Sequence, residues 1–229
     1  MDAEQRLLPT PTPTQTPLVA AAIRYRVLEA PPLRAILEAT SDDAVEKSLK
    51  RLQHGGWLHQ IQLAGRRACY TLSRRGVLAL GLSKKAQKHM GQAAVITNLA
   101  MLCFCARKKV ERLTPDEVRD AYPELDRPGL QVGNYFSDTS VNPPRLTWIL
   151  VDRGSSPPVL VRKAGNIVKK AYKFSSLMQL VQGNQFAIVI LVPNERKKWL
   201  VERILVKRFF AQVNVTVDVV SDIEPLLLA

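Results

Sequence analysis

The chain has 229 residues, of which 33 are Lys or Arg and 20 are Asp or Glu, so its formal net charge is +13. Apolar residues make up 46% of the sequence, which is enough for a packed core and argues against wholesale disorder. The positive charge indicates an acidic polymer or surface as partner, and no apolar run reaches the roughly 18 residues of a membrane-spanning helix.

The first 39 residues predict a leader and two helices. Pro and Thr alternate over much of residues 1–17, which favours a flexible, extended leader. A helix is expected over residues 18–29, and Pro31-Pro32 should end it. A second, shorter helix is expected over residues 33–39.

The third helix is predicted over residues 42–54. Ser41 is a suitable N-cap, and Gly55-Gly56 should end the helix. Apolar residues at helical spacing predict its inward face: Val45, Leu49 and Leu52.

A hairpin follows, with strands over residues 57–63 and 68–72. Ser73 should cap a helix over residues 74–80, and a long apolar helix is expected over residues 85–105. This long helix is a candidate dimer surface. We interpret Trp57 as a core residue rather than a stacking platform.

The second half predicts a small α/β layer over residues 111–229. Thr114-Pro115 should start a helix that runs to about Tyr122. The order after it is β-β-α-β-α-β. Strands are expected over residues 146–152, 159–163, 186–192 and 213–220, and helices over residues 166–181 and 195–210.

The positive charge is unevenly distributed. Residues 1–110 contain 17 basic and 7 acidic side chains, a net charge of +10, and no Asp or Glu lies between Lys47 and Val110. A solvated face normally mixes the two signs of charge. We therefore expect nucleic acid as the polyanion that neutralises this region, rather than anionic lipid or solvent alone.

Three short helices and a hairpin with a basic tip are typical of the winged helix-turn-helix. Residues 48–58 resemble the recognition-helix end of that family, and residues 70–76 resemble its return strand and following helix. We expect an α+β winged-helix domain over residues 18–82 and a connecting helix over residues 83–110.

This plan predicts which side chains contact DNA. Those on the recognition helix, of which Arg51 is suited to reading guanine, are Lys47, Ser48, Lys50 and Arg51. Those at the hairpin tip and on the next helix are Arg66, Arg67, Arg74 and Arg75. An ordinary solvated surface, or a winged helix that binds protein, remains open. Three acids at the helix start would oppose phosphate: Asp42, Asp43 and Glu46. They could instead accept hydrogen bonds from cytosine or favour the positive end of the helix dipole.

Over residues 20–210 the arrangement resembles the replication-relaxation family of plasmids and integrative elements, some members of which are called mobilisation accessory proteins. The second half of the resemblance rests on the segments 150–154, 158–163 and 188–193 and on a basic helix from Lys169. The resemblance implies a winged helix followed by a domain similar to the restriction-endonuclease fold.

The sequence departs from that family at the nuclease motif. A nuclease of this fold needs an Asp on one strand and a carboxylate two positions before a Lys on the next, to hold Mg²⁺. The resemblance places the second part at Val161-Arg162-Lys163, where Val161 replaces the carboxylate. Asp152 and Asp138 alone do not make a metal site, so we expect no catalytic or metal-binding residues and no cofactor. The possible nucleophiles lack an activating His or carboxylate pattern: Tyr135, Tyr172 and Ser155.

The second domain should have a basic strand–helix edge that extends the DNA footprint or covers a protein partner. Its residues are Arg162, Lys163, Lys169, Lys170 and Lys173.

The sequence thus predicts a non-enzymatic protein of a mobile genetic element that binds double-stranded DNA. Its protein partner would be a relaxase, replication protein or recombinase, and it could form a homodimer. A Mg²⁺-dependent nicking nuclease using Asp152 and Lys163, and a repressor of the element's operon, are the alternatives.

The expected compartment is the cytoplasm, with no membrane association. The first residues lack the basic and apolar regions of a signal peptide. Three cysteines suit a reduced compartment better than a disulfide framework.

Overall fold

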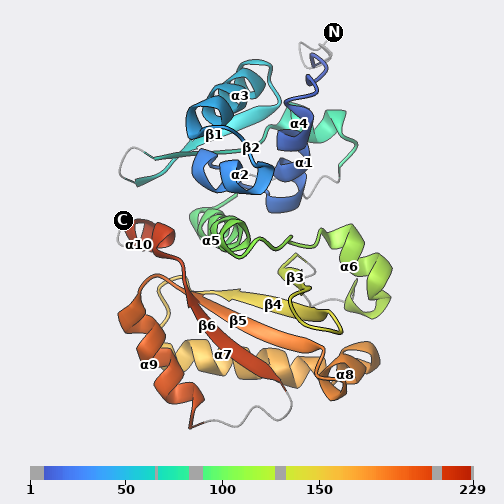
Figure 1. Cartoon of the computed structure of the whole chain (residues 1–229), viewed down its shortest axis with the longest axis vertical. Coiled ribbons are helices and arrows are strands. Elements are labelled where there is room, and N and C mark those ends of the chain that lie inside the picture. The colour runs from blue at the N-terminus through green and yellow to red at the C-terminus, as the bar shows by residue number, and fades with distance from the viewer. Residues whose placement is uncertain (1–7, 65–66, 83–89, 127–132, 208–212, 228–229) are drawn as a thin grey trace. The chain divides into compact units, whose positions relative to one another are not determined.

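A computed structural model of the chain describes residues 8–64, 67–82, 90–126, 133–207 and 213–227. The chain divides into two compact units, Met1–Arg107 and Lys108–Leu228 (Figure 1). The first contains a two-stranded sheet and the second a four-stranded sheet, each accompanied by helices. The fold is therefore of mixed α and β class, as the sequence predicts.

Three helices open the first unit: α1 (Thr16–Tyr25), α2 (Ala30–Leu37) and α3 (Asp42–His54). Pro31 and Pro32 lie in the first turn of α2 rather than before the helix, because a first-turn Pro loses no intrahelical hydrogen bond. The expected break between the first two helices therefore falls a few residues earlier.

The bounds of α3 are as predicted. The Ser41 hydroxyl accepts a hydrogen bond from the Ala44 backbone N at 3.2 Å, which caps the helix. Val45, Leu49 and Leu52 are buried, so the predicted inward face is confirmed.

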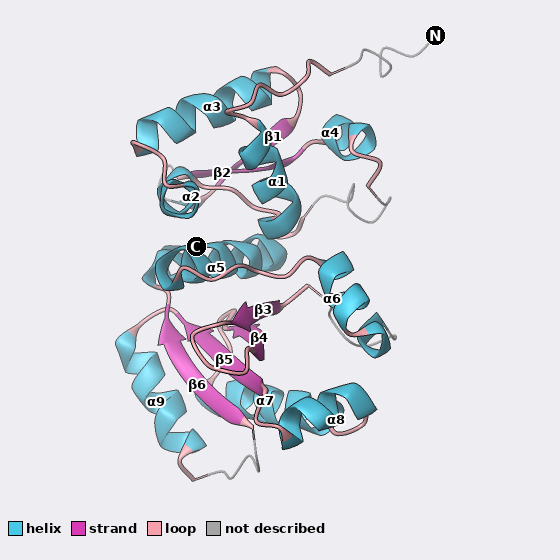
Figure 2. Ribbon diagram, turned by 45° about the vertical axis from the view of Figure 1, so that its right-hand side comes forward, coloured by secondary structure: helices cyan, strands magenta, loops and turns pink. Residues whose placement is uncertain are grey.

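A hairpin of β1 (Leu58–Gln62) and β2 (Ala68–Leu72) runs beside helices α1 to α3 (Figure 2). The strands are antiparallel and pair Leu58 with Leu72. Helix α4 (Arg74–Ala79) follows, capped by Ser73 as expected. It approaches the hairpin so closely that a Cβ on Gly76 would lie 2.5 Å from the Trp57 carbonyl oxygen, so only glycine fits there.

The expected leader is wrong for its last part. Trp57 donates from Nε1 to the Pro9 carbonyl at 2.7 Å, and α1 already begins at Thr16. The chain from Pro9 is therefore attached to the first unit. Residues 1–7 lie outside the described residues. The interpretation of Trp57 as core is confirmed, since it is buried.

Helix α5 (Gln92–Lys108) is apolar on all sides, which is typical of a buried helix. Its residues from Leu99 to Ala106 are all buried. The expectation that this helix forms a dimer surface stays a prediction. The start expected at residue 85 lies outside the described residues.

The second unit begins with α6 (Pro115–Ala121), which Thr114 caps as predicted. Glu117 completes a capping box with Thr114. Its sheet has the order β3-β4-β5-β6. The strands are β3 (Tyr135–Asp138), β4 (Arg145–Val151), β5 (Phe186–Val192) and β6 (Asn214–Val219). β3 is antiparallel to β4, and β4, β5 and β6 are mutually parallel.

Helices make the connections that parallel strands require. They are α7 (Pro157–Ala171), α8 (Ser175–Gln182) and α9 (Glu195–Leu205). α7 and α9 pack against each other and against β5 on one face of the sheet (Figure 1). A short 3-10 turn (Ser221–Ile223) and α10 (Glu224–Leu227) follow β6.

The strand predicted over residues 159–163 is wrong, because this segment lies in α7. Two prolines in the first turn favour a helix start, and the buried positions recur at helical spacing. These positions are Leu160, Val161, Ala164, Val168 and Ala171. The helix predicted over residues 166–181 is two helices, α7 and α8, and β3 was not predicted.

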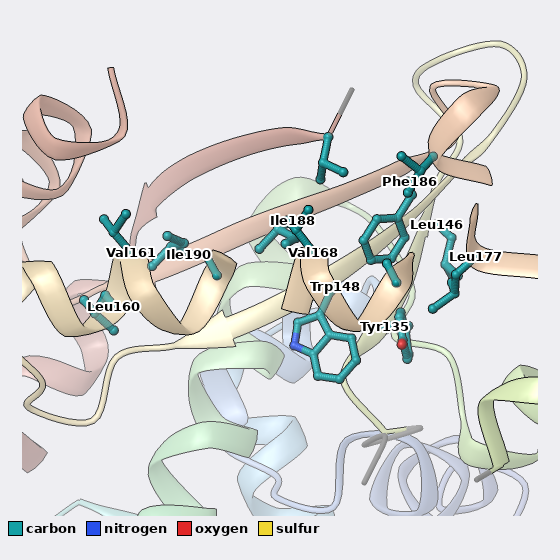
Figure 3. Packing of buried hydrophobic residues seen from close by; sticks show 14 of the residues in the cluster. Tyr135, Leu146, Trp148, Leu160, Val161, Val168, Leu177, Phe186, Ile188 and Ile190 are labelled. Carbon is teal, nitrogen blue, oxygen red and sulfur yellow. The ribbon is translucent and has the colours of Figure 1, made fainter. Parts of the chain in front are cut away.

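The core of the second unit lies between the sheet and its helices (Figure 3). Trp148 of β4 and Tyr135 of β3 contact edge to face, with ring centroids 4.8 Å apart. Leu160, Val161 and Val168 of α7 and Ile188 and Ile190 of β5 belong to the same buried cluster.

Candidate functional site

The outward face of α3 carries cations. Lys47, Lys50 and Arg51 are exposed, on the side of the helix opposite the buried Val45 and Leu49. Lys47 and Arg51 have no ion-pair partner among the described residues. Their charges are therefore available to an external anion.

Ser48 is less accessible than these cations. Its hydroxyl donates to the Ala44 carbonyl at 3.0 Å and is half-buried. The hydroxyl proton is used within the helix, so Ser48 can offer an external ligand only an acceptor.

Two of the three acids near this face have partners within the unit. Asp42 forms an ion pair with Arg34 at 2.7 Å. Glu46 accepts a hydrogen bond from the Tyr70 hydroxyl at 2.7 Å and lies 3.6 Å from Lys50. The repulsion of phosphate that the sequence implied is thereby reduced, and Asp43 is the acid that stays exposed without a described partner.

Tyr70 holds the Glu46 carboxylate in place through its hydrogen bond. Burial raises the pKa of Tyr70, and its hydrogen bond to Glu46 raises it further, so the phenol stays protonated and donates. This contact attaches α3 to β2. Sequence reasoning missed it, because 24 residues separate the two partners.

Arg67, at the hairpin, forms an ion pair within the protein. Its Nε and Nη2 donate to the two carboxylate oxygens of Glu29 at 2.9 and 2.8 Å. The Glu29 side chain is 11% exposed and that of Arg67 is 28% exposed, so this is a largely buried pair. Arg67 therefore connects the hairpin to the start of α2, and its guanidinium is not available to contact phosphate. Arg66 lies outside the described residues.

Arg74 and Arg75 are exposed in the first turn of α4, as expected. The Arg75 guanidinium lies near Gly56, which follows the C-cap Gly55 of α3 and has a φ of +82°. Arg75 thus approaches the carboxyl end of α3.

The five basic residues predicted in the second unit lie on α7 and its end, not on a strand–helix edge. Their side chains fall into two groups. Lys163 and Lys170 line a cavity beside the sheet, whereas Arg162, Lys169 and Lys173 are exposed and do not line it.

Asp152 and Lys163 are brought together around Ser155, at the carboxyl end of β4. The Ser155 backbone N donates to Asp152 Oδ1 at 2.8 Å, and Lys163 Nζ donates to Ser155 Oγ at 2.9 Å. Lys197 Nζ from α9 lies 2.5 Å from Asp152 Oδ2, and Asp152 is fully buried. Asp152 is therefore engaged by the protein itself. Lys163 donates to Ser155 and so does not act on it as a base in this arrangement.

Across the described residues, no group of three or more His, Cys, Asp or Glu side chains is placed to hold a metal ion. None of the helices in the described part of the chain is long and apolar enough to cross a bilayer.

Comparison with known proteins gives no relative: no family model, no curated protein and no solved structure matches this chain. The resemblance to the replication-relaxation family therefore stays a prediction.

Proposed function

We propose that the chain is a non-enzymatic protein that holds double-stranded DNA through α3. It would serve a mobile genetic element as an accessory to a separate relaxase, replication protein or recombinase. The mobile-element context rests on the sequence resemblance, and the DNA contact rests on the residues of the first unit.

The order of elements in the first unit supports a winged helix-turn-helix. α2 and α3 are joined by residues 38–41, and an antiparallel hairpin follows α3. In such domains the second helix of the pair enters the major groove. α3 has that position in the order.

The outward face of α3 is the observation that carries the proposal. Lys47 and Arg51 are exposed and without a described ion-pair partner. Of the nearby acids, Asp42 is paired with Arg34, and Glu46 accepts a hydrogen bond from Tyr70. Arg51 has the geometry to donate two hydrogen bonds to guanine, and Lys50 is placed to contact phosphate. α3 would thus provide both sequence reading and affinity.

The exposed cations in and just after α7 that do not line the cavity would extend this footprint or meet a protein partner. They are Arg162, Lys169 and Lys173. The engagement of Asp152 by Lys197 favours the non-enzymatic proposal over the nicking nuclease, because a Mg²⁺ site would need that carboxylate.

The test compares two variants that each lose one exposed positive charge of the first unit. Preferred duplexes are selected from a random pool, and Kd is measured for the wild type, Arg51→Gln and Arg26→Gln on a selected and a scrambled duplex. We expect Arg51→Gln to weaken binding to the selected duplex by about tenfold or more, and binding to the scrambled one by less. Arg26 follows α1, and Arg26→Gln should stay close to the wild type.

Equal losses in the two variants, or no preference of the wild type for the selected duplex, would contradict a reading role for α3. Footprinting on the element then separates the accessory protein from the repressor. Protection of an origin or an element end supports the proposal, and protection confined to the promoter of its own operon supports the repressor.

A further inference from the structure

The second unit contains a cavity of about 260 Å³ between α7 and the β4 side of the sheet. Its floor is apolar, with Trp148 and Leu150 from β4, Leu177 from α8 and Phe186 from β5. Three of these side chains, Trp148, Leu177 and Phe186, can be followed in Figure 3. All the residues that line it belong to the second unit.

One side of α7 forms the opposite wall. Lys163, Asn166, Ile167 and Lys170 line the cavity, and their spacing of three and four residues places them in one stripe along the helix. The wall therefore carries two cations, one amide and one aliphatic side chain.

The rim of the cavity is positively charged. Arg153, which follows β4, joins Lys163 and Lys170, and among the described residues no carboxylate lines the cavity. Lys163 Nζ is held in place by Ser155 Oγ at 2.9 Å. Arg153 is exposed and has no partner among the described residues, so its guanidinium can turn to an anion. This rim favours a phosphate or carboxylate.

The floor favours a flat ring. The Trp148 indole is fixed by its edge-to-face contact with Tyr135, and Phe186 is fully buried. Asn166, which has no partner among the described residues, offers both a donor and an acceptor within the same cavity. A ring that carries its own donors and acceptors would satisfy this amide, whereas an aliphatic chain would not.

We propose that this cavity binds one nucleotide, with its phosphate at Arg153 and Lys163 and its base on the floor beside Trp148. Ligand pockets for drug-sized molecules run from about 300 to 1,000 Å³. This cavity of about 260 Å³ is slightly smaller than that range, which limits it to a ligand no larger than a single nucleotide. Base contact with aromatic side chains tolerates any base. This site goes beyond the proposed function, because duplex binding by α3 does not use it. A free mononucleotide and a nucleotide of single-stranded DNA share the required chemistry.

The test follows the indole N–H signals of the full-length protein by NMR. The chain has three tryptophans, and Trp148→Phe identifies the signal of Trp148. The probes are a deoxynucleoside monophosphate, a 5′-phosphorylated oligothymidylate and inorganic phosphate. We expect a saturable shift of the Trp148 signal with the mononucleotide, and weaker binding of inorganic phosphate.

Two charge-matched variants make the test specific. Arg153→Gln/Lys163→Gln should raise the Kd of the nucleotide by at least about tenfold. Arg196→Gln/Lys207→Gln removes the same charge from exposed positions outside the cavity and should leave Kd unchanged. Arg153→Gln alone, at an exposed loop position, serves if the double variant does not fold.

A shift with the oligonucleotide alone supports the site and assigns it to single-stranded DNA, and a shift with the mononucleotide assigns it to free nucleotides as well. No saturable shift with either probe overturns the proposal. Phosphate that binds as tightly as the nucleotide, or equal losses in both charge-matched variants, also overturns it.

Discussion

At the scale of single residues, burial and a neighbouring charge determine the state of Cys69. This thiol is fully buried on β2. Burial raises its pKa to about 12, and the negative charge of Glu29 acts in the same direction, while Arg67 opposes it. The thiol therefore stays protonated at neutral pH and is a poor nucleophile.

This raised pKa predicts a loss of stability in alkali. Below pH 9 the thiol is protonated in both the folded and the unfolded chain. Between pH 9 and about 12 the unfolded chain releases the proton and the folded chain keeps it, so the free energy of unfolding falls as pH rises. The limiting slope is about 1.4 kcal/mol per pH unit. Urea unfolding at pH 8, 9 and 10 should show this fall.

Cys69→Ala is the control for that measurement. The substitution should lower stability at every pH by creating a cavity, but it should flatten the slope between pH 9 and 10. An unchanged slope in Cys69→Ala would assign the alkaline loss to other groups, such as the buried Tyr135, whose pKa is also raised by burial.

Single residues also show where sequence reasoning stops. Arg67 counts as a cation at the turn when the sequence is read locally. Its partner Glu29 lies 38 residues away in the sequence, so only the fold reveals that the two side chains form an ion pair. The exposed Arg51, in contrast, was predictable because helical spacing alone separates it from the buried Leu49 and Leu52.

At the scale of elements, local signals succeed where they are redundant. Ser41, the buried spacing of α3 and the two glycines at its end all agree, and the helix has the predicted bounds. The start of α7 gives conflicting signals, because three branched or apolar residues in succession favour a strand while the preceding prolines favour a helix start. Packing of α7 against β5 and α9 settles this conflict, and a sequence alone does not contain that packing.

The connection between β4 and α9 predicts the effect of removing Asp152. Its carboxylate is fully buried and engages Ser155 and Lys197, so Asp152→Ala leaves Lys197 without its partner and the loop without its acceptor. We expect a loss of about 3 kcal/mol in the free energy of unfolding, measured by urea. Glu195→Ala is the control. It removes an exposed acid of α9, the helix that carries Lys197, and Glu195 lies 4.0 Å from Lys198. This substitution should change stability little.

The wild type and Asp152→Ala should also be assayed for nicking of supercoiled DNA in the presence of Mg²⁺. If Asp152→Ala keeps wild-type stability and abolishes a Mg²⁺-dependent nicking activity, the nuclease alternative replaces the structural role. A loss of stability in Asp152→Ala, with no Mg²⁺-dependent nicking by the wild type, supports the structural role.

At the scale of the whole molecule, the first unit carries more of the positive charge than the second. Residues 1–107 contain 15 basic and 7 acidic side chains, a net charge of +8, and residues 108–229 contain 18 and 13, a net charge of +5. Composition alone gives the sign of this imbalance, and the class of partner stays a prediction. The contacts that engage Asp42 and Glu46 required the fold, since Arg34 and Tyr70 come from other elements.

The same imbalance predicts a steep salt dependence of DNA binding by the intact protein. Each phosphate contact contributes about −0.9 to the slope of log K against log salt concentration. Lys50 is 57% exposed and only weakly paired with Glu46 at 3.6 Å, so we assign it a phosphate contact. Lys50→Gln should reduce the slope by about one and weaken binding to selected and scrambled duplexes alike. Arg26→Gln should retain the wild-type slope. Fluorescence anisotropy across a salt series measures all three proteins, and an affinity that hardly changes with salt would exclude phosphate contact as the source of binding.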